Sequence, residues 1–391
     1  MSKHPLYQAL LEQISEHVEP SVPQSSRERL VLLVMGIIVS ESASPAKMAE
    51  ALDEIGIGDA QVDSIERRIR RTENDPNISA SLSFHPLARQ YLLWGRPNHL
   101  LLAIDPTTQN DRIVMLTVSV VYRGRSLPLA WAIWAGNQPL KGLGFWERVA
   151  ALLQLIATLL PVRVPVTIVA DRAFGTPSFT DLVQAQGWHY IVRVQGQTHY
   201  QDRVGHDLSL RSLVTRRGQR RKLRGQVFKK QGWREASVVV YWGVQHSTPL
   251  CLVSDLPPDW TLIATYRQRY TIEALFRDYK FAGWHWEQSQ VTDLEHMQRL
   301  LVGMALALWL SVMIGTQVVD DYLDRHPQPT HRTLPPIAKR SLFQHGLHRL
   351  KQWAARNCRL PLTWHLSDWN AFAWQAFYRQ RLLQHTVFGL L

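Results

Sequence analysis

The sequence has only two cysteines, Cys251 and Cys358, and they do not form a CxxC pair. A disulfide framework and a cysteine-based zinc site are therefore not indicated, and a reducing cytoplasm fits this composition. The strings HExxH, GxSxG and GxxxxGKS/T do not occur, so zinc proteases, serine hydrolases and P-loop NTPases lack their signatures here. The N-terminal segment mixes acids and histidines with apolar residues, which is not typical of a secretory signal peptide. We therefore expect a cytoplasmic protein.

The sequence also has fewer acidic residues than basic ones. The chain of 391 residues has 32 Asp and Glu against 44 Lys and Arg, which gives a formal charge of +12. Such an excess attracts a partner rich in negative charge, either nucleic acid or an anionic membrane surface. With 46% hydrophobic residues, the chain can also bury a sizeable core. Its length predicts two or three structural units.

One segment, 300–319, has no charged residue and is long enough to cross a bilayer. A central helix packed on several sides inside a large domain is also apolar all round. Gly303, Gly315 and the polar Ser311 and Thr316 favour this second interpretation. We therefore expect a buried helix and no membrane association.

Residues 1–97 carry helical apolar patterns interrupted by a Ser-Ala-Ser-Pro break. The third helical stretch clusters Arg67, Arg68, Arg70 and Arg71 after a short turn. Such a helix can lie against DNA or can simply expose a solvated basic face.

From about residue 98 the pattern changes to apolar, β-branched runs that predict strands. Three of them follow one another closely and should be antiparallel, and then helices alternate with strands. The expected strands are 99–105, 111–124, 125–136, 164–171 and 188–194, and the expected helices are 144–160 and about 177–187. This order predicts an α/β fold with a mixed sheet flanked by helices.

A basic, β-rich segment interrupts this alternation at 195–258 and looks inserted. It concentrates cations at Arg216, Arg217, Arg220, Arg221, Lys222 and Arg224. The chain is thus expected to divide into a helical N-terminal unit (1–97), the first part of a core (98–194), this insertion (195–258), the second part of the core (259–325) and a C-terminal helical region (326–391).

Two aspartates follow apolar strands directly. Asp105 comes after HLLLAI, and Asp171 comes after VPVTIVA. Ligands and catalytic groups collect at the carboxyl ends of strands in α/β sheets. Either aspartate could instead cap a turn.

Glu273 lies in a helical stretch with an aromatic residue and cations on its own side. At about 100° per residue, Tyr266, Arg269, Glu273, Arg277 and Lys280 stay within a stripe roughly 80° wide. Such a stripe is either a salt-bridged helix surface or a carboxylate metal ligand among phosphate-binding groups. Leu275 and Phe276 point elsewhere, toward an expected core.

The spacing of four of these residues is Tyr-x2-Arg-x3-Glu-x6-Lys, from Tyr266 to Lys280. In this register the sequence resembles the DDE transposases of bacterial insertion sequences, specifically insertion-sequence family four. The two aspartates agree, because Asp105 begins an Asp-x-Thr string and Asp171 begins an Asp-Arg-x-Phe string. The resemblance covers roughly residues 25–355.

The resemblance implies a ribonuclease-H-like catalytic core, a DNA-binding N-terminal domain over 1–97 and a C-terminal part used in assembly. It implies a transposase that cleaves DNA and then transfers the strand, by in-line attack of water and later of a 3′-hydroxyl. The implied partner is double-stranded DNA, both transposon ends and target, bound by a dimer in a nucleoid-associated setting.

The implied cofactor is a pair of Mg²⁺ ions, with Mn²⁺ able to substitute. Asp105 would bridge the ions, and Asp171 and Glu273 would complete one side each. Two ions about 4 Å apart can assist both oxygens of an in-line phosphodiester displacement. Arg269 and Lys280 would hold phosphates, and Tyr266 would contact a phosphate or sugar. The basic insertion would grip the DNA backbone without reading sequence.

Two alternatives share these residues. One is a ribonuclease-H-like nuclease or resolvase that cuts DNA without strand transfer. The other is a domesticated, catalytically inactive DNA-binding protein, which retention of all three carboxylates disfavours. A glycosidase using a carboxylate pair would explain neither the basic insertion nor the cations around Glu273.

Overall fold

The fold is taken from a computed structural model that describes residues 3–57, 61–138, 142–326, 337, 340–358 and 369. Most of the expected C-terminal region, 326–391, lies outside the described residues, including the Pro-rich break at 327–336.

The N-terminal part is a group of helices. They are α1 (Pro5–His17), α2 (Gln24–Ser40), α3 (Pro45–Glu54), α4 (Val62–Glu73), a π-helical turn η1 (Ala80–Phe84) and α5 (His85–Trp94). Helix α2 is buried continuously from Leu30 to Val39, as its apolar run predicts. Helix α4 buries Ile65 and Ile69 and exposes Arg67 on its other side.

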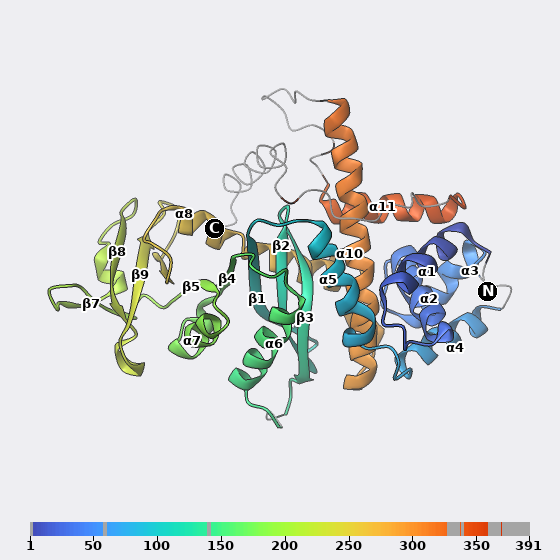
Figure 1. The fold of residues 1–391 in the computed structure, drawn as a ribbon, viewed down its shortest axis with the longest axis horizontal. Coiled ribbons are helices and arrows are strands. Elements are labelled where there is room, and N and C mark those ends of the chain that lie inside the picture. Colours follow the sequence, from blue (N-terminus) through green and yellow to red (C-terminus); the bar gives the residue numbers. More distant parts are fainter. Residues whose placement is uncertain are drawn as a thin grey trace.

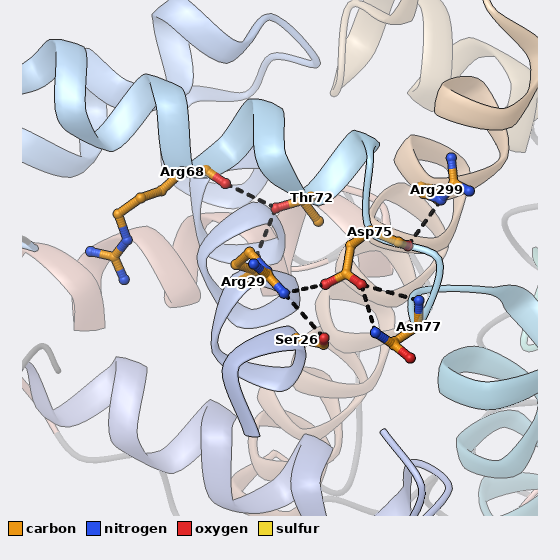
Figure 2. Close-up of polar contacts among 7 residues, drawn as sticks. All are labelled: Ser26, Arg29, Arg68, Thr72, Asp75, Asn77 and Arg299. Atoms are coloured by element: carbon orange, nitrogen blue, oxygen red, sulfur yellow. Dashed lines mark hydrogen bonds and ion pairs between the residues drawn. The ribbon is translucent and has the colours of Figure 1, made fainter. Parts of the chain in front are cut away.

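A polar network fixes α4 against α2 and against the later helix α10 (Leu294–Arg325), as Figure 2 shows. Arg29 on α2 contacts the buried Asp75 carboxylate at 2.6 Å. Arg299 on α10 donates to the backbone carbonyl of Asp75 at 3.0 Å and to that of Glu73 at 2.9 Å. The Arg68 side chain points away from the network, and its carbonyl accepts from Thr72. The end of α4 is therefore held from two sides.

The core is a 10-stranded sheet with the order β3-β2-β1-β4-β5-β10-β9-β8-β6-β7. Its first five strands are β1 (Leu100–Gln109), β2 (Ile113–Tyr122), β3 (Arg125–Ala135), β4 (Val166–Ala170) and β5 (His189–Arg193). Strands β1, β2 and β3 are antiparallel neighbours, whereas β4 is parallel to both β1 and β5. This is the mixed sheet that the order of elements predicts.

A three-residue turn, 110–112, joins β1 to β2, and a two-residue turn, 123–124, joins β2 to β3. Asn110 and Asp111 at the first turn have positive φ, and so do Arg123 and Gly124 at the second. Turns with two such residues match the twist of an antiparallel hairpin.

The basic segment continues the same sheet beyond β5. Its strands are β6 (His199–Gln201), β7 (Asp207–Ser209), β8 (Arg220–Val227), β9 (Arg234–Tyr241) and β10 (Leu250–Ser254). Strand β10 pairs antiparallel with β5, and β9 and β8 follow it outward. In Figure 1 these strands form the end of the molecule opposite the N-terminal helices.

Helices pack on the strands. Helix α6 (Phe145–Leu159) contacts β3, and α7 (Pro177–Ala185) contacts β5. Helix α8 (Thr261–Arg267) packs on β4 and β5, and α9 (Tyr270–Arg277) packs on β1 and β3. A π-helical turn, η5 (Asp278–Ala282), follows α9 directly.

Helix α10 stands between the N-terminal helices and the sheet (Figure 1). It is the one continuous helix in the described residues long and apolar enough to span a membrane; the bent pair of α2 and α3 passes the same test only when taken together. The apolar window of α10 is 89% buried inside the protein, as the buried-helix interpretation predicted. A Cβ at Gly303 would lie 2.6 Å from Leu33 Cδ2, and one at Gly315 would overlap the Leu342 carbonyl of α11 (Leu342–Ala355). Its glycines therefore allow close packing on α2 and α11.

Candidate active site

Strands β1 and β4 bring the two aspartates together. Ile104 is paired with Ala170 in the parallel register, so Asp105 and Asp171 follow at equivalent positions on neighbouring strands. Neighbouring strands lie about 5 Å apart. Residues 66 positions apart in sequence thus meet at one point of the sheet edge.

The prediction that Asp105 ends its strand is wrong. Strand β1 continues to Gln109, because residues 106–109 still pair with β2. Pairing with β4 does stop at Ile104. Pro106 has no backbone N–H, so it suits a position where one side of the strand has lost its partner.

Arg269 links these strands to the Glu273 helix. Its Nη1 donates to Asp105 Oδ2 at 3.0 Å, and its Nη2 donates to Glu273 Oε1 at 2.7 Å. The Arg269 side chain is 6% exposed and that of Glu273 is 52% exposed. The guanidinium therefore lies between two of the three predicted carboxylates and neutralises part of their charge.

Several polar atoms around Arg269 have no hydrogen-bond partner among the described residues. They are Asp171 Oδ1, the Tyr266 hydroxyl and Arg269 Nε, and all three are buried. Buried polar atoms in native structures are usually paired, and unpaired ones need an explanation such as an absent ligand or ion. Their concentration beside two carboxylates identifies this point as the candidate site.

The electrostatics agree with this assignment. Burial raises the pKa of Asp105 to about 6; Arg269 opposes the shift, and Asp171 and Glu273 add to it. Burial also raises the pKa of Tyr266 to about 12. Burial alone would lower the pKa of Arg269, but Tyr266, Asp105 and Glu273 raise it overall, so the guanidinium stays charged. The carboxylates repel one another, and any further cation placed among them would be favoured.

This shift predicts a pH-dependent stability in the presence of a chelator. Because the pKa of Asp105 is raised from 3.8 to about 6 in the folded state, the unfolded chain releases this proton first as pH rises. Stability should then fall between pH 4 and 6, by about 3 kcal/mol in total. Asp105→Asn should lack this loss. Urea unfolding at several pH values should therefore show that the free energy of unfolding of the variant rises relative to that of the wild type between pH 4 and 6. If the free energy of unfolding changed with pH equally in both proteins, the raised pKa of Asp105 would be contradicted.

The residues fit a divalent cation by their chemistry. All three donors are carboxylates, which Mg²⁺ prefers, and Asp171 Oδ1 is buried without a partner. Within the described part of the chain, however, three or more Asp, Glu, His or Cys side chains do not come close enough to hold a metal. The bridging position of Arg269 accounts for this, since its guanidinium separates Asp105 from Glu273. Arg269 would have to turn aside for the three carboxylates to share an ion.

The prediction of one stripe along a continuous helix is wrong. Helix α8 ends at Arg267, α9 begins at Tyr270, and the π-helical turn η5 changes the angular spacing before Lys280. Tyr266 is 2% exposed, and Lys280 lies 3.8 Å from Glu287. Leu275 and Phe276 are buried, as predicted.

Sequence reasoning missed the contacts that hold this helix on the sheet. Asp278 forms a buried ion pair with Arg125 of β3. Ser126 Oγ lies 2.7 Å from Thr271 Oγ1. The one available signal was a charged residue, Arg125, beginning an apolar strand.

The six basic residues predicted to bind DNA in the insertion lie on the outer part of the sheet, and all of them are exposed. Some have partners: Lys222 contacts Asp259 at 3.5 Å, and Arg224 contacts Glu235 at 2.9 Å. Arg220 lies over the Trp260 ring at 4.6 Å. Arg216, Arg217 and Arg221 are among the exposed cations of this surface.

The fold is a mixed α/β sheet flanked by helices, with two aspartates at equivalent positions on neighbouring strands. Residues 148–310, less than half of the chain, match the family model described as the transposase DDE domain. This segment contains Asp171 and Glu273 and supports an enzyme of the transposase or endonuclease class. The match does not specify an insertion-sequence family, so family four stays a prediction.

Two further comparisons add little. A comparison with curated proteins gives no match. Among solved structures, the catalytic domain of human endonuclease V is similar with a TM-score of 0.25 and 11% identity, over 48% of this chain and 85% of that chain. A similarity this low does not bear on the site.

Proposed function

We propose that the protein is a transposase that cleaves DNA and joins the cleaved strand to a target, with Asp105, Asp171 and Glu273 as its catalytic carboxylates. The observation that carries this proposal is the register of β1 and β4, which sets two aspartates side by side, with Glu273 linked to Asp105 through Arg269. The match over 148–310 supports the same chemistry.

The three carboxylates would hold two Mg²⁺ ions, or Mn²⁺ in their place, which would polarise the scissile phosphodiester and activate the attacking hydroxyl group. The chain's own residues supply placement and charge. Tyr266 and Arg269 would offer their unpaired hydroxyl and Nε–H to the DNA strand once the guanidinium leaves its carboxylates. Lys280 would hold a neighbouring phosphate.

Other parts of the chain would position DNA. The helical unit 1–97 presents Arg67, Arg70 and Arg71 on the exposed side of α4 and would contact DNA there. The two ends of a transposon would be brought together by a dimer in the DNA complex.

The experiment that tests the function uses a DNA end that is already cut. A transposase joins its 3′-hydroxyl to a target duplex in the presence of Mg²⁺, whereas a nuclease or resolvase of the same fold only cuts. Joined products that vanish in Asp171→Asn are the expected result. Cleavage without any joining would assign the nuclease instead.

The exposed cations of the insertion are predicted to bind DNA backbone. Replacing Arg216, Arg217, Arg220 and Arg221 with Gln should weaken binding to all duplex sequences alike. The slope of log affinity against log salt should flatten by about 0.9 for each phosphate that these side chains no longer neutralise. Fluorescence anisotropy at several salt concentrations measures this slope. An unchanged slope would show that these side chains are only solvated.

A further inference from the structure

A polar cavity lies beside the candidate active site. Its volume is about 400 Å³, and three separate segments line it: 172–176 after β4, 195–199 after β5, and 228–231 between β8 and β9. The first of these segments begins at the residue that follows Asp171. The cavity therefore connects the aspartate strand of the core with the basic outer strands.

The cavity lining carries an excess of positive charge. Arg172, Lys229 and Lys230 supply it, and none of the described lining residues is acidic. One carboxylate beside it offsets part of this charge, because Asp207 pairs with Lys229 and accepts from His199 Nδ1 at 2.6 Å. Arg172 and Lys230 are exposed side chains.

The walls also offer neutral hydrogen-bonding groups. Thr176 Oγ1 is buried and has no partner among the described residues, although it lines the cavity. Gln195, Gln197 and Gln231 add side-chain amides. Cations together with hydroxyl and amide donors are the groups that proteins use for phosphate oxygens.

The backbone around the cavity is held in place. Phe174 and Phe228 are both buried, and Phe228 has a φ of 69°, a left-handed conformation that turns the chain into the 229–231 loop. A Cβ at Gly175 would lie 2.6 Å from the Arg193 carbonyl, so this loop packs directly on the end of β5. Both cationic walls are therefore fixed relative to Asp171.

We infer that this cavity binds a backbone phosphodiester of the DNA strand. This phosphate would be adjacent, in the same strand, to the one engaged at Asp105 and Asp171. The inference rests on the proposed function for the identity of the strand. The cavity is larger than one phosphate requires and leaves room for the flanking sugars. The outer strands then have two roles. They attract the DNA backbone through their exposed cations, and they supply a defined phosphate subsite beside the proposed catalytic residues.

The test compares Arg172→Gln, Lys230→Gln and the double variant with a matched control, Arg163→Gln. Arg163 is exposed and precedes β4, at the end of that strand remote from Asp171. Thermal melting with inorganic pyrophosphate is the first measurement. Pyrophosphate should raise the melting temperature of the wild type, the control and Asp171→Asn, and should not stabilise the double variant.

Affinity for duplex DNA is the second measurement. Each single variant should weaken binding by about tenfold, and the double variant should lower the salt slope by about two. Equal pyrophosphate protection in all variants would overturn the inference. Loss of protection with an unchanged DNA salt slope would also overturn it, because the cavity would then bind free phosphate and not DNA.

The two proposals can fail separately. If the wild type joins DNA ends but the cavity variants bind DNA like the control, the proposed function stands and the cavity inference falls. If no variant or wild-type protein joins DNA, but the cavity variants lose pyrophosphate and DNA binding, the inference stands and the transposase assignment falls.

Discussion

Asp171→Asn is expected to abolish DNA cleavage and joining while leaving the fold and DNA binding nearly unchanged. Asp171 Oδ1 is buried and unpaired within the described residues, so an amide at this position breaks no hydrogen bond of that atom. The amide removes one carboxylate from the set that would hold divalent cations. The loss in rate should be at least about 10²–10³-fold, the scale seen when one group that stabilises transition-state charge is removed.

Asp105→Asn and Glu273→Gln should lose activity to the same extent but should also alter stability, because both carboxylates contact Arg269. Asp321→Asn is a matched control, since Asp321 is exposed on α10 away from the paired aspartates. Cleavage rates on assembled protein–DNA complexes, together with anisotropy for binding, measure both quantities. A cleavage rate of Asp171→Asn near that of the control would refute the proposed mechanism.

Arg269→Ala is expected to reduce both stability and activity. Its guanidinium is buried and pairs with Asp105 and Glu273, so its removal leaves Asp105 facing the other carboxylates without a cation. Breaking a buried ion pair costs about 3–5 kcal/mol; the exposure of Glu273 places the expected loss toward the lower figure. Arg269→Lys should recover only part of the lost stability and activity, because an ammonium group cannot reproduce the forked contact with two carboxylates.

Lys280→Ala is the comparison for this variant. Its contact with Glu287 is long, and such pairs contribute about 1 kcal/mol or less. Urea unfolding should therefore separate the two variants clearly, while cleavage falls in both. Unchanged stability in Arg269→Ala would mean that the buried bridge contributes nothing to folding.

Much of the sheet could be predicted from the sequence. Closely spaced β-branched runs and the alternation that follows them predicted β1 to β5 with α6 and α7 between, and the structure has these elements. Asp105 and Asp171 each follow an apolar run, which is a local signal. The spacing of Tyr266, Arg269, Glu273 and Lys280 predicted the third element of the candidate site.

The rest depends on relations that no local pattern encodes. Continuous helical geometry predicted a single stripe, but the helix is interrupted between α8 and α9 and again by the π-helical turn at η5. Tyr266 and Arg269 are buried. The reach of Arg269 to Asp105 follows from packing of α9 on β1, across 164 positions of sequence. The cavity beside Arg172 likewise depends on pairing between distant segments, because Tyr200 of β6 pairs with Val227 of β8 and brings Lys230 close.

The location of α10 has a consequence for how the chain acquires its structure. Helix α2 is apolar on all sides from Leu30 to Val39, and part of that surface is covered by a helix that begins only at Leu294. During synthesis, part of the apolar surface of the N-terminal helices is therefore expected to stay exposed to solvent until α10 has emerged. Contacts between such distant segments slow folding and prolong exposure to aggregation. The N-terminal helices share a hydrophobic core with α10, and we therefore expect them to reach their native packing only together with it.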